Sequence, residues 1–198
     1  MQNTPTAIND NAREILEQPQ DEAAAAEPAP ARPRTIAEEI DALTDPSFMT
    51  SLARGRIHIA ALAVGTAQRA LDESIAFAAS ATQGGTPIGG FQLVQAMLAD
   101  QQTGVSAGRA LVRDSAKKWL SDEDRRIAPS VAKVFCTEMA GNVADLAVQI
   151  HGGTGYMRGV PVERIYRDVR LLRLYEGTSE IQRLIIGGGL MKAARKPT

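Results

Sequence analysis

Apolar residues recur at three- and four-residue spacing along most of residues 48–190, which is the period of an amphipathic helix. The pattern predicts helices over residues 48–81, 88–120, 129–150 and 161–171, and a last one from about residue 178. The recurring apolar positions of the first helix are Leu52, Ile59, Leu62, Ala63, Ala67, Ala70, Leu71, Ile75 and Ala78. We expect an interior rich in Ala and Gly, which would let the helices pack closely. No segment has the period of a strand. Three long helices joined by short turns, with a fourth returning, predict an all-α fold, an antiparallel up-down four-helix bundle.

Glycine-rich segments are expected to end or interrupt several of these helices. Gln83–Pro87 has the composition of a turn, and Gly152-Gly153 is expected to stop the third helix. Gly187–Gly189 lies within the last helix, where each glycine costs ~1 kcal/mol relative to alanine, so we expect that helix to fray or end there. Ser179 and Gln182 have the S-x-x-Q form of a capping box at its start.

The N-terminal part of the chain differs in composition from the rest. Residues 1–34 contain no aromatic residue and end in an alternating Pro/Ala segment, so they cannot bury enough apolar surface to offset the entropy of ordering. Thr35–Glu38 has the form of a capping box, which favours a short helix over residues 35–43. We therefore predict a disordered tail over residues 1–46 and a helical bundle domain over residues 47–198.

Charge is distributed unevenly between these two parts. Residues 1–46 hold ten acidic and three basic residues, whereas residues 47–198 hold thirteen acidic and nineteen basic residues. The mildly basic second part is compatible with an anionic partner such as a coenzyme phosphate. Its basic residues are interspersed with acidic ones and not clustered, so we expect no nucleic-acid partner.

Several classes of site and location are excluded by simple counts. No apolar run approaches the ~18 residues of a membrane span. The N-terminus has neither the basic n-region nor the apolar h-region of a signal peptide. We therefore expect a cytoplasmic protein without a membrane span. Cys136 is the single cysteine, and His58 and His151 are far apart, so no disulfide or metal site is expected. Cys136 lies in an apolar pattern and is expected to be a buried packing residue.

A candidate catalytic carboxylate, Glu176, precedes the last helix. It follows Leu174 and Tyr175 and precedes Gly177, so we expect it at an apolar, tightly turning corner. A carboxylate that acts as a base on a weakly acidic C–H needs a mostly dry pocket. The alternative is that Glu176 only interacts with the positive end of the helix that follows, which stabilises by ~0.3–1 kcal/mol.

A glycine-rich loop, Gly152–Gly155, follows the third helix. Such loops let backbone N–H groups approach phosphate oxygens, although a simple helix stop is the alternative. The spacing of Gly153, Gly155 and Gly159 does not match the dinucleotide fingerprint, and a helix precedes the loop where the fingerprint needs a strand. A nicotinamide site is therefore rejected. His151, in the last turn of the third helix, is expected to interact with the helix dipole.

Together these segments resemble the C-terminal domain of acyl-CoA dehydrogenases, the flavin enzymes that desaturate acyl-CoA thioesters. The resemblance covers roughly residues 48–190. Ala147–Tyr156 resembles the first C-terminal signature of the family. Pro161–Asp168 and Tyr175–Gln182 resemble the second.

The resemblance implies a flavoprotein oxidoreductase of fatty acid metabolism, with FAD as cofactor and acyl-CoA as substrate. Glu176 matches the family's catalytic base, which removes the α-proton while a hydride leaves the β-carbon for FAD. The cofactor-binding positions match Gln149, Gly152 and Gly153, which face the FAD of a neighbouring subunit, and Thr178 and Glu180. The substrate-binding positions match Arg56, Tyr175 and Gly177.

The chain departs from the family in two respects that bear on its function. The family's N-terminal helical domain and middle β-domain have no counterpart in these residues. Ala81 and Gly84 stand where the family has an arginine and a phenylalanine that hold the partner's FAD. We therefore expect a homo-oligomer, or a hetero-oligomer with another acyl-CoA dehydrogenase chain that supplies the missing domains. The alternative is a non-catalytic oligomerisation or interaction bundle derived from the family.

Overall fold

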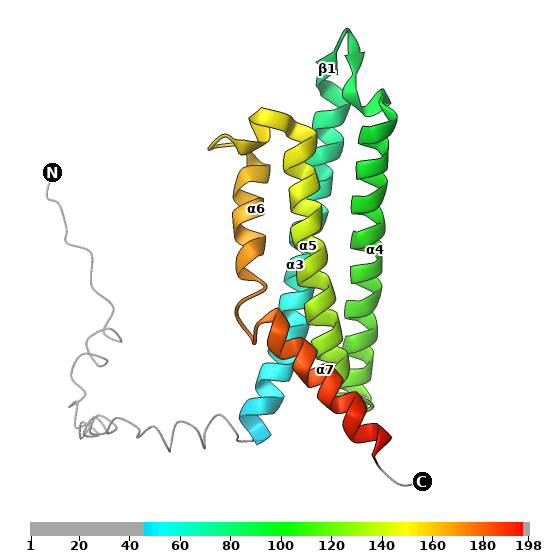
Figure 1. Cartoon of the computed structure of the whole chain (residues 1–198), viewed down its shortest axis with the longest axis vertical. Coiled ribbons are helices and arrows are strands. Elements are labelled where there is room, and N and C mark those ends of the chain that lie inside the picture. The colour runs from blue at the N-terminus through cyan, green and yellow to red at the C-terminus, as the bar shows by residue number, and fades with distance from the viewer. Residues whose placement is uncertain (1–45, 196–198) are drawn as a thin grey trace, which may run out of the picture. The chain divides into compact units, whose positions relative to one another are not determined.

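The structure, a computed structural model, describes residues 46–195. The described residues belong to one compact unit, Ile40–Thr198. The short helix expected over residues 35–43 and the tail before it lie outside the described residues, so the domain boundary after residue 46 stays a prediction. The helices, labelled as in Figure 1, are α3 (Pro46–Ser80), α4 (Gln92–Leu120), α5 (Ile127–His151), α6 (Pro161–Leu171) and α7 (Ser179–Ala194).

Helices make up nearly all of the described part of the chain, so the predicted all-α class is confirmed. Figure 1 shows α3, α4, α5 and α6 side by side with alternating direction, and α7 crossing near one end of the bundle. The four-helix description therefore leaves out α7, which packs obliquely on α5. The end of the bundle where α7 crosses also holds the candidate carboxylate.

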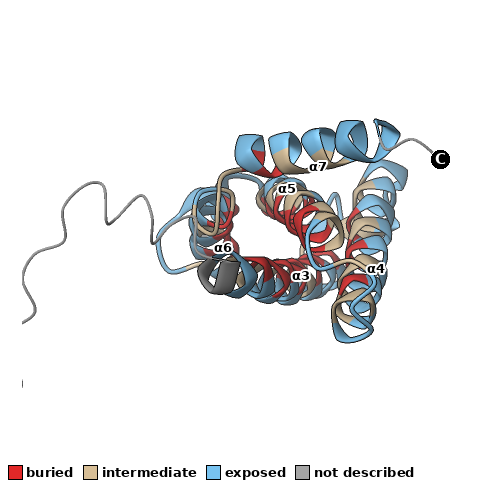
Figure 2. Cartoon of the chain, turned by 90° about the horizontal axis from the view of Figure 1, so that it is seen from below, coloured by how far each residue is buried: buried red, intermediate tan, exposed pale blue. Residues whose placement is uncertain are grey.

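The contact between α3 and α5 is the centre of the core, and its buried positions are mainly alanines. These alanines are 0% exposed: Ala60, Ala63, Ala67 and Ala70 on α3, and Ala132, Ala140, Ala144 and Ala147 on α5. Figure 2 shows the buried positions of both helices facing each other. Side chains this small let two helix backbones approach closely.

The predicted buried face of α3 is only partly correct. Leu71 is buried, but Leu62 is 51% exposed and Ile75 is 49% exposed. The helix is apolar on more than one side, and the side that packs against α5 consists mainly of alanines. The alanines of the predicted pattern, Ala63, Ala67, Ala70 and Ala78, are buried, so the misplaced positions are the larger Leu62 and Ile75.

The turn predicted at Gln83–Pro87 is confirmed. Gly84 and Gly85 have φ angles of 57° and 81°, and they reverse the chain between two short antiparallel strands. These strands, which the sequence pattern did not indicate, are β1 (Thr82–Gln83) and β2 (Thr86–Pro87). A 3-10 turn, η1 (Ile88–Gly90), then leads into α4.

The last helix differs from its prediction at both ends. α7 continues through Gly187–Gly189, so the expected end there is wrong. A Cβ atom at Gly189 would lie 2.7 Å from Cδ1 of Ile127, so the glycine lets α7 pack against the start of α5 without moving that side chain, which offsets its low helix propensity. The predicted S-x-x-Q capping box is also wrong, because the N-cap is Thr178, whose hydroxyl accepts from the N–H of Ile181.

Two neighbouring glycines of α7 should respond oppositely to the same substitution. A Cβ atom at Gly188 meets no atom within 4 Å, so Gly188→Ala should raise the free energy of unfolding by about 0.5–1 kcal/mol through helix propensity. Gly189→Ala must displace Ile127 and should lose that gain. Urea denaturation of both variants measures the difference, and an equal gain at the two positions would show that α7 does not pack on Ile127.

Candidate functional site

Glu176 lies in a sharp turn between α6 and α7. Its φ angle is 57°, and that of Gly177 is 87°, so two successive residues are in the left-handed region. Gly177 adopts this conformation freely, but for a residue with a side chain it costs roughly 1 kcal/mol or more. The turn therefore holds Glu176 in a conformation that needs support from the surrounding residues.

The carboxylate of Glu176 lies directly against the backbone of α3. A Cβ atom at Gly55 would stand 2.6 Å from Oε2 of Glu176 and 2.8 Å from its Cδ. This Oε2 atom is buried and has no hydrogen-bond partner among the described residues. The absence of a side chain at Gly55 therefore creates the space that the carboxylate occupies.

Two buried cations surround this corner, so it is not the purely apolar environment that the sequence suggested. Arg56 is 4% exposed and its Nε has no hydrogen-bond partner within the described part of the chain. Burial lowers the pKa of Arg56, and the negative charge of Glu176 opposes that shift. Arg56 and Glu176 thus interact through charge in a largely dry setting.

Lys133 on α5 is the second cation, and the sequence interpretation missed it. It is fully buried, and its Nζ donates a hydrogen bond of 2.8 Å to the carbonyl oxygen of Gly177. Burial lowers the pKa of Lys133, whereas Glu138 opposes this shift most strongly among the nearby acids. A lysine between Ala132 and Val134 on the apolar face of a helix was the signal available in the sequence.

A pocket of about 430 Å³ opens beside Arg56. Its walls combine three arginines with apolar side chains. The lining residues are Met49, Thr50, Ala53, Arg56, Arg125, Arg126 and Ile185, from α3, α7 and the start of α5. Such a lining suits a ligand that carries both an anionic group and an apolar part.

The other residues predicted next to Glu176 also lie at this corner. Tyr175 is half-buried against the core, and burial, with a smaller effect of Glu176, raises the pKa of its hydroxyl. Thr178 is the N-cap of α7. Glu180 is exposed in the first turn of α7, where hydrogen bonds from its own backbone N–H and from Thr178 lower its pKa.

The glycine-rich loop lies far from Glu176 within the same chain. Gln149, Gly152 and Gly153 are exposed at the C-terminal end of α5, where η2 (Gly152–Tyr156) begins. Sixteen residues of α5 separate Gln149 from Lys133, which is about 24 Å along the helix axis. The structure therefore brings Arg56, Glu176 and their neighbours together and leaves the glycine-rich loop at the opposite end of the bundle (Figure 1).

His151 and Cys136 are packing residues. The His151 ring stacks on Phe77 with 4.2 Å between ring centroids, and its Nδ1 lies 2.8 Å from the carbonyl oxygen of Ala147. Cys136 is buried, and burial raises the pKa of its thiol to about 12.

No described helix is long and apolar enough to cross a membrane. The described residues contain no cluster of three potential metal ligands.

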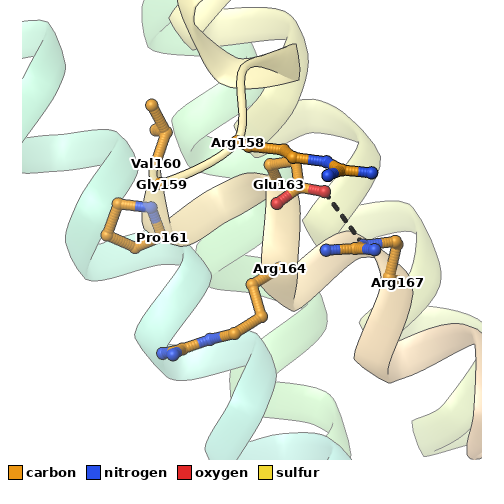
Figure 3. A pocket seen from close by; sticks show the side chains of 7 residues that line it. All are labelled: Arg158, Gly159, Val160, Pro161, Glu163, Arg164 and Arg167. Atoms are coloured by element: carbon orange, nitrogen blue, oxygen red, sulfur yellow. Dashed lines mark ion pairs between the residues drawn. The ribbon is translucent and has the colours of Figure 1, made fainter.

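A second pocket, of about 510 Å³, lies at the start of α6. Figure 3 shows Arg158 beside the ion pair of Glu163 and Arg167, with Arg164 pointing to the other side. The ion pair measures 2.9 Å between Arg167 Nε and Glu163 Oε1. Glu163 and Arg167 are four residues apart in α6, so they lie on the same face of that helix and can form this ion pair.

Comparison with known proteins shows the family to which the chain belongs. Residues 46–191 match the model of the acyl-CoA dehydrogenase C-terminal domain, so the chain belongs to the acyl-CoA dehydrogenase family. It is 48% identical over 147 residues to the probable acyl-CoA dehydrogenase YngJ of Bacillus subtilis, a match that covers 73% of this chain and 38% of that protein.

Solved structures agree with this assignment. Butyryl-CoA dehydrogenase from Megasphaera elsdenii superposes with a TM-score of 0.71 at 36% identity, over 72% of this chain and 37% of that one. An acyl-CoA dehydrogenase from Bacillus anthracis in complex with FAD gives a TM-score of 0.69 at 33% identity, over 73% and 28%. The chain thus spans between 28% and 38% of the length of these three relatives.

The contact between Gly55 and Glu176 predicts a coupled response to substitution. Gly55→Ala should give none of the usual helix-propensity gain of about 0.5–1 kcal/mol, because the new methyl group displaces the carboxylate. In a Glu176→Ala background the same substitution should recover that gain. The measurement is the free energy of unfolding from urea titrations of the four chains.

Gly65 provides the control for this cycle. It lies on the same helix, and a Cβ atom there meets nothing within 4 Å, so Gly65→Ala should stabilise equally in both backgrounds. A Gly55→Ala effect that is the same with and without Glu176 would contradict the placement of the carboxylate.

Proposed function

We propose that Glu176 removes the α-proton of an acyl-CoA thioester during α,β-desaturation, in an assembly whose other chains complete the site. The observation that carries this proposal is the buried Oε2 atom of Glu176, which has no hydrogen-bond partner among the described residues. A carboxylate oxygen in this state is available to accept a proton. A helix-capping role alone would not require the carboxylate to lie against Gly55.

The surrounding charges suit this chemistry. Removing an α-proton from a thioester places negative charge on the substrate. Arg56 and Lys133 bring two buried positive charges to the corner, and preorganised charges in a dry site stabilise developing negative charge effectively. Tyr175 and Gly177, on either side of Glu176, are proposed to contact the thioester end of the substrate.

The pocket beside Arg56 supports acyl-CoA as the ligand class. Arg125 and Arg126 provide positive charge for phosphate groups of the coenzyme, while Met49 and Ile185 provide apolar surface. Arg56 lines this pocket and also interacts with the charge of Glu176. One ligand could therefore reach from the arginines to the carboxylate.

The residues proposed for FAD belong to two groups. Gln149, Gly152 and Gly153 would contact the FAD of a neighbouring subunit, and Cβ positions at both glycines face open space, so a cofactor could approach the backbone closely. Thr178 and Glu180 would lie near the FAD of their own site. When bound, FAD would supply the acceptor for the substrate hydride. Since the two groups occupy opposite ends of the bundle, this arrangement requires an oligomer.

A non-catalytic interaction bundle is the second candidate. The observation that favours it is the β1–β2 hairpin, where Gly84 is exposed and Ala81 is only partly buried. Neither residue has a side chain that could bind a partner's cofactor as an arginine or a phenylalanine would. In this case the chain would pair with a full-length dehydrogenase without contributing a working site.

The test is a flavin spectrum of the full chain, alone and with a dehydrogenase partner that contains the two other domains. Anaerobic addition of acyl-CoA should bleach the flavin absorbance of the assembly. Glu176→Gln should slow bleaching by about 10²–10⁴-fold, the usual contribution of a general base. Glu123→Gln, at an exposed position between α4 and α5, is the control and should bleach at the parent rate.

The outcome separates the two candidates. An assembly that co-purifies with the chain but whose bleaching does not depend on Glu176 would favour the interaction bundle. Bleaching that is lost in Glu176→Gln and retained in Glu123→Gln would favour the catalytic function.

A further inference from the structure

Two fully buried polar side chains converge on the backbone of the turn that carries Glu176. Nε2 of Gln182 donates to the carbonyl oxygens of both Glu176 and Gly177, each at 3.0 Å. Nζ of Lys133 donates to the carbonyl oxygen of Gly177 at 2.8 Å. Both side chains are 0% exposed, and they come from different helices, α7 and α5.

The burial of Lys133 shows that this contact is not incidental packing. Removing an ammonium group from water is unfavourable, and burial lowers the pKa of Lys133 accordingly. An apolar side chain of similar volume would fill the same space without that penalty. What a lysine adds is a charged donor to Gly177 and a positive charge in the corner.

The turn needs such donors because of its conformation. Glu176 has a left-handed φ angle of 57°, which a residue with a side chain rarely keeps without external contacts. The position of Gln182 also requires a glycine at 177, where a Cβ atom would lie 2.6 Å from Nε2. The two carbonyl groups are thus held on one side of the turn, and the Glu176 side chain is directed toward Gly55.

Glu138 on α5 supports the same turn from outside. Its Oε1 accepts a hydrogen bond of 2.7 Å from the hydroxyl of Ser179, and its Oε2 lies 3.2 Å from Nε of Arg173. The N–H of Ser179 in turn donates to the carbonyl oxygen of Arg173 at 3.2 Å. The turn is therefore fastened to α5 at both of its ends, with Lys133 and Gln182 at its centre.

We propose that Lys133 and Gln182 are positioning residues, which fix the direction of the Glu176 carboxylate by binding the carbonyl oxygens of Glu176 and Gly177. The catalytic part of this proposal rests on the proposed function of Glu176 as the base. The positioning part concerns the turn alone. Without these donors the turn relaxes from its left-handed conformation, and the carboxylate moves away from the space over Gly55.

The chain offers a closely matched control for this proposal. Gln101 on α4 is also 0% exposed, and its Nε2 donates to the backbone carbonyl of Val143 at 3.1 Å. Its Oε1, like that of Gln182, has no hydrogen-bond partner among residues 46–195. Gln101→Met and Gln182→Met therefore remove equivalent buried groups, but only the second removes contacts with the turn.

The first measurement uses the full chain alone and needs no cofactor. Hydrogen exchange of the backbone amide of Ser179 should be at least 10-fold faster in Lys133→Met and in Gln182→Met than in the parent. In Gln101→Met it should match the parent. Gln182→Asn shortens the side chain and keeps its polarity, so it provides a milder variant if the methionine variants do not fold. Unchanged exchange in every folded variant of Lys133 and Gln182 would overturn the positioning role.

The second measurement uses the assembly with FAD and the dehydrogenase partner. The rate of flavin bleaching at saturating acyl-CoA should fall about 10- to 100-fold in the Lys133 and Gln182 variants, with little change in the acyl-CoA concentration for half-saturation. Gln101→Met should keep both values. A parent assembly that does not bleach would sink the proposed function while faster amide exchange still supported the positioning of the turn. Parent-like bleaching in the variants would overturn the catalytic part.

Discussion

The close contact between α3 and α5 is the constraint on which the rest of this structure depends. Alanines occupy most of the buried positions on both helices, so the two backbones approach closely. This approach places Gly55 and Arg56 of α3 on one side of a narrow corner and Lys133 of α5 on the other. The turn after α6 enters this corner, and Glu176 occupies the space left at Gly55. Larger side chains between the helices would separate the groups that form the site.

The corner gathers charge where a helical bundle would normally bury apolar groups. One carboxylate and two cations lie there, and the hydrogen bonds that hold the turn come from Lys133 and Gln182. Buried polar groups of this kind are costly unless they have partners, so the network constrains every residue in it. The left-handed conformation of Glu176 depends on the same hydrogen bonds. The contacts that hold the carbonyl oxygens of Glu176 and Gly177 also set the direction of the Glu176 carboxylate.

Helical periodicity and turn composition located the helices of the described residues to within a few positions, and short ordered motifs identified the family. Properties that depend on contacts between distant residues were not accessible in the same way. The sequence pattern missed Lys133, because a lysine in an apolar helix face has no visible partner until Gly177 is brought beside it. It ended the last helix at Gly187–Gly189, because helix propensity does not include packing against Ile127. It placed Leu62 on the apolar face together with the neighbouring Ala63, because helical spacing alone does not show which of two adjacent positions faces α5.

The separation of about 24 Å along α5 between the glycine-rich loop and Lys133 has a genetic consequence. Suppose that each working site combines the glycine-rich loop of one chain with the carboxylate of another. A substitution of Gly153 and a substitution of Glu176 then damage opposite ends of the bundle, and so different halves of a site. Mixed assemblies of two differently damaged chains could then contain some intact sites, which neither chain forms alone. Two such mutant chains would therefore complement each other, because each working site is formed by two polypeptides.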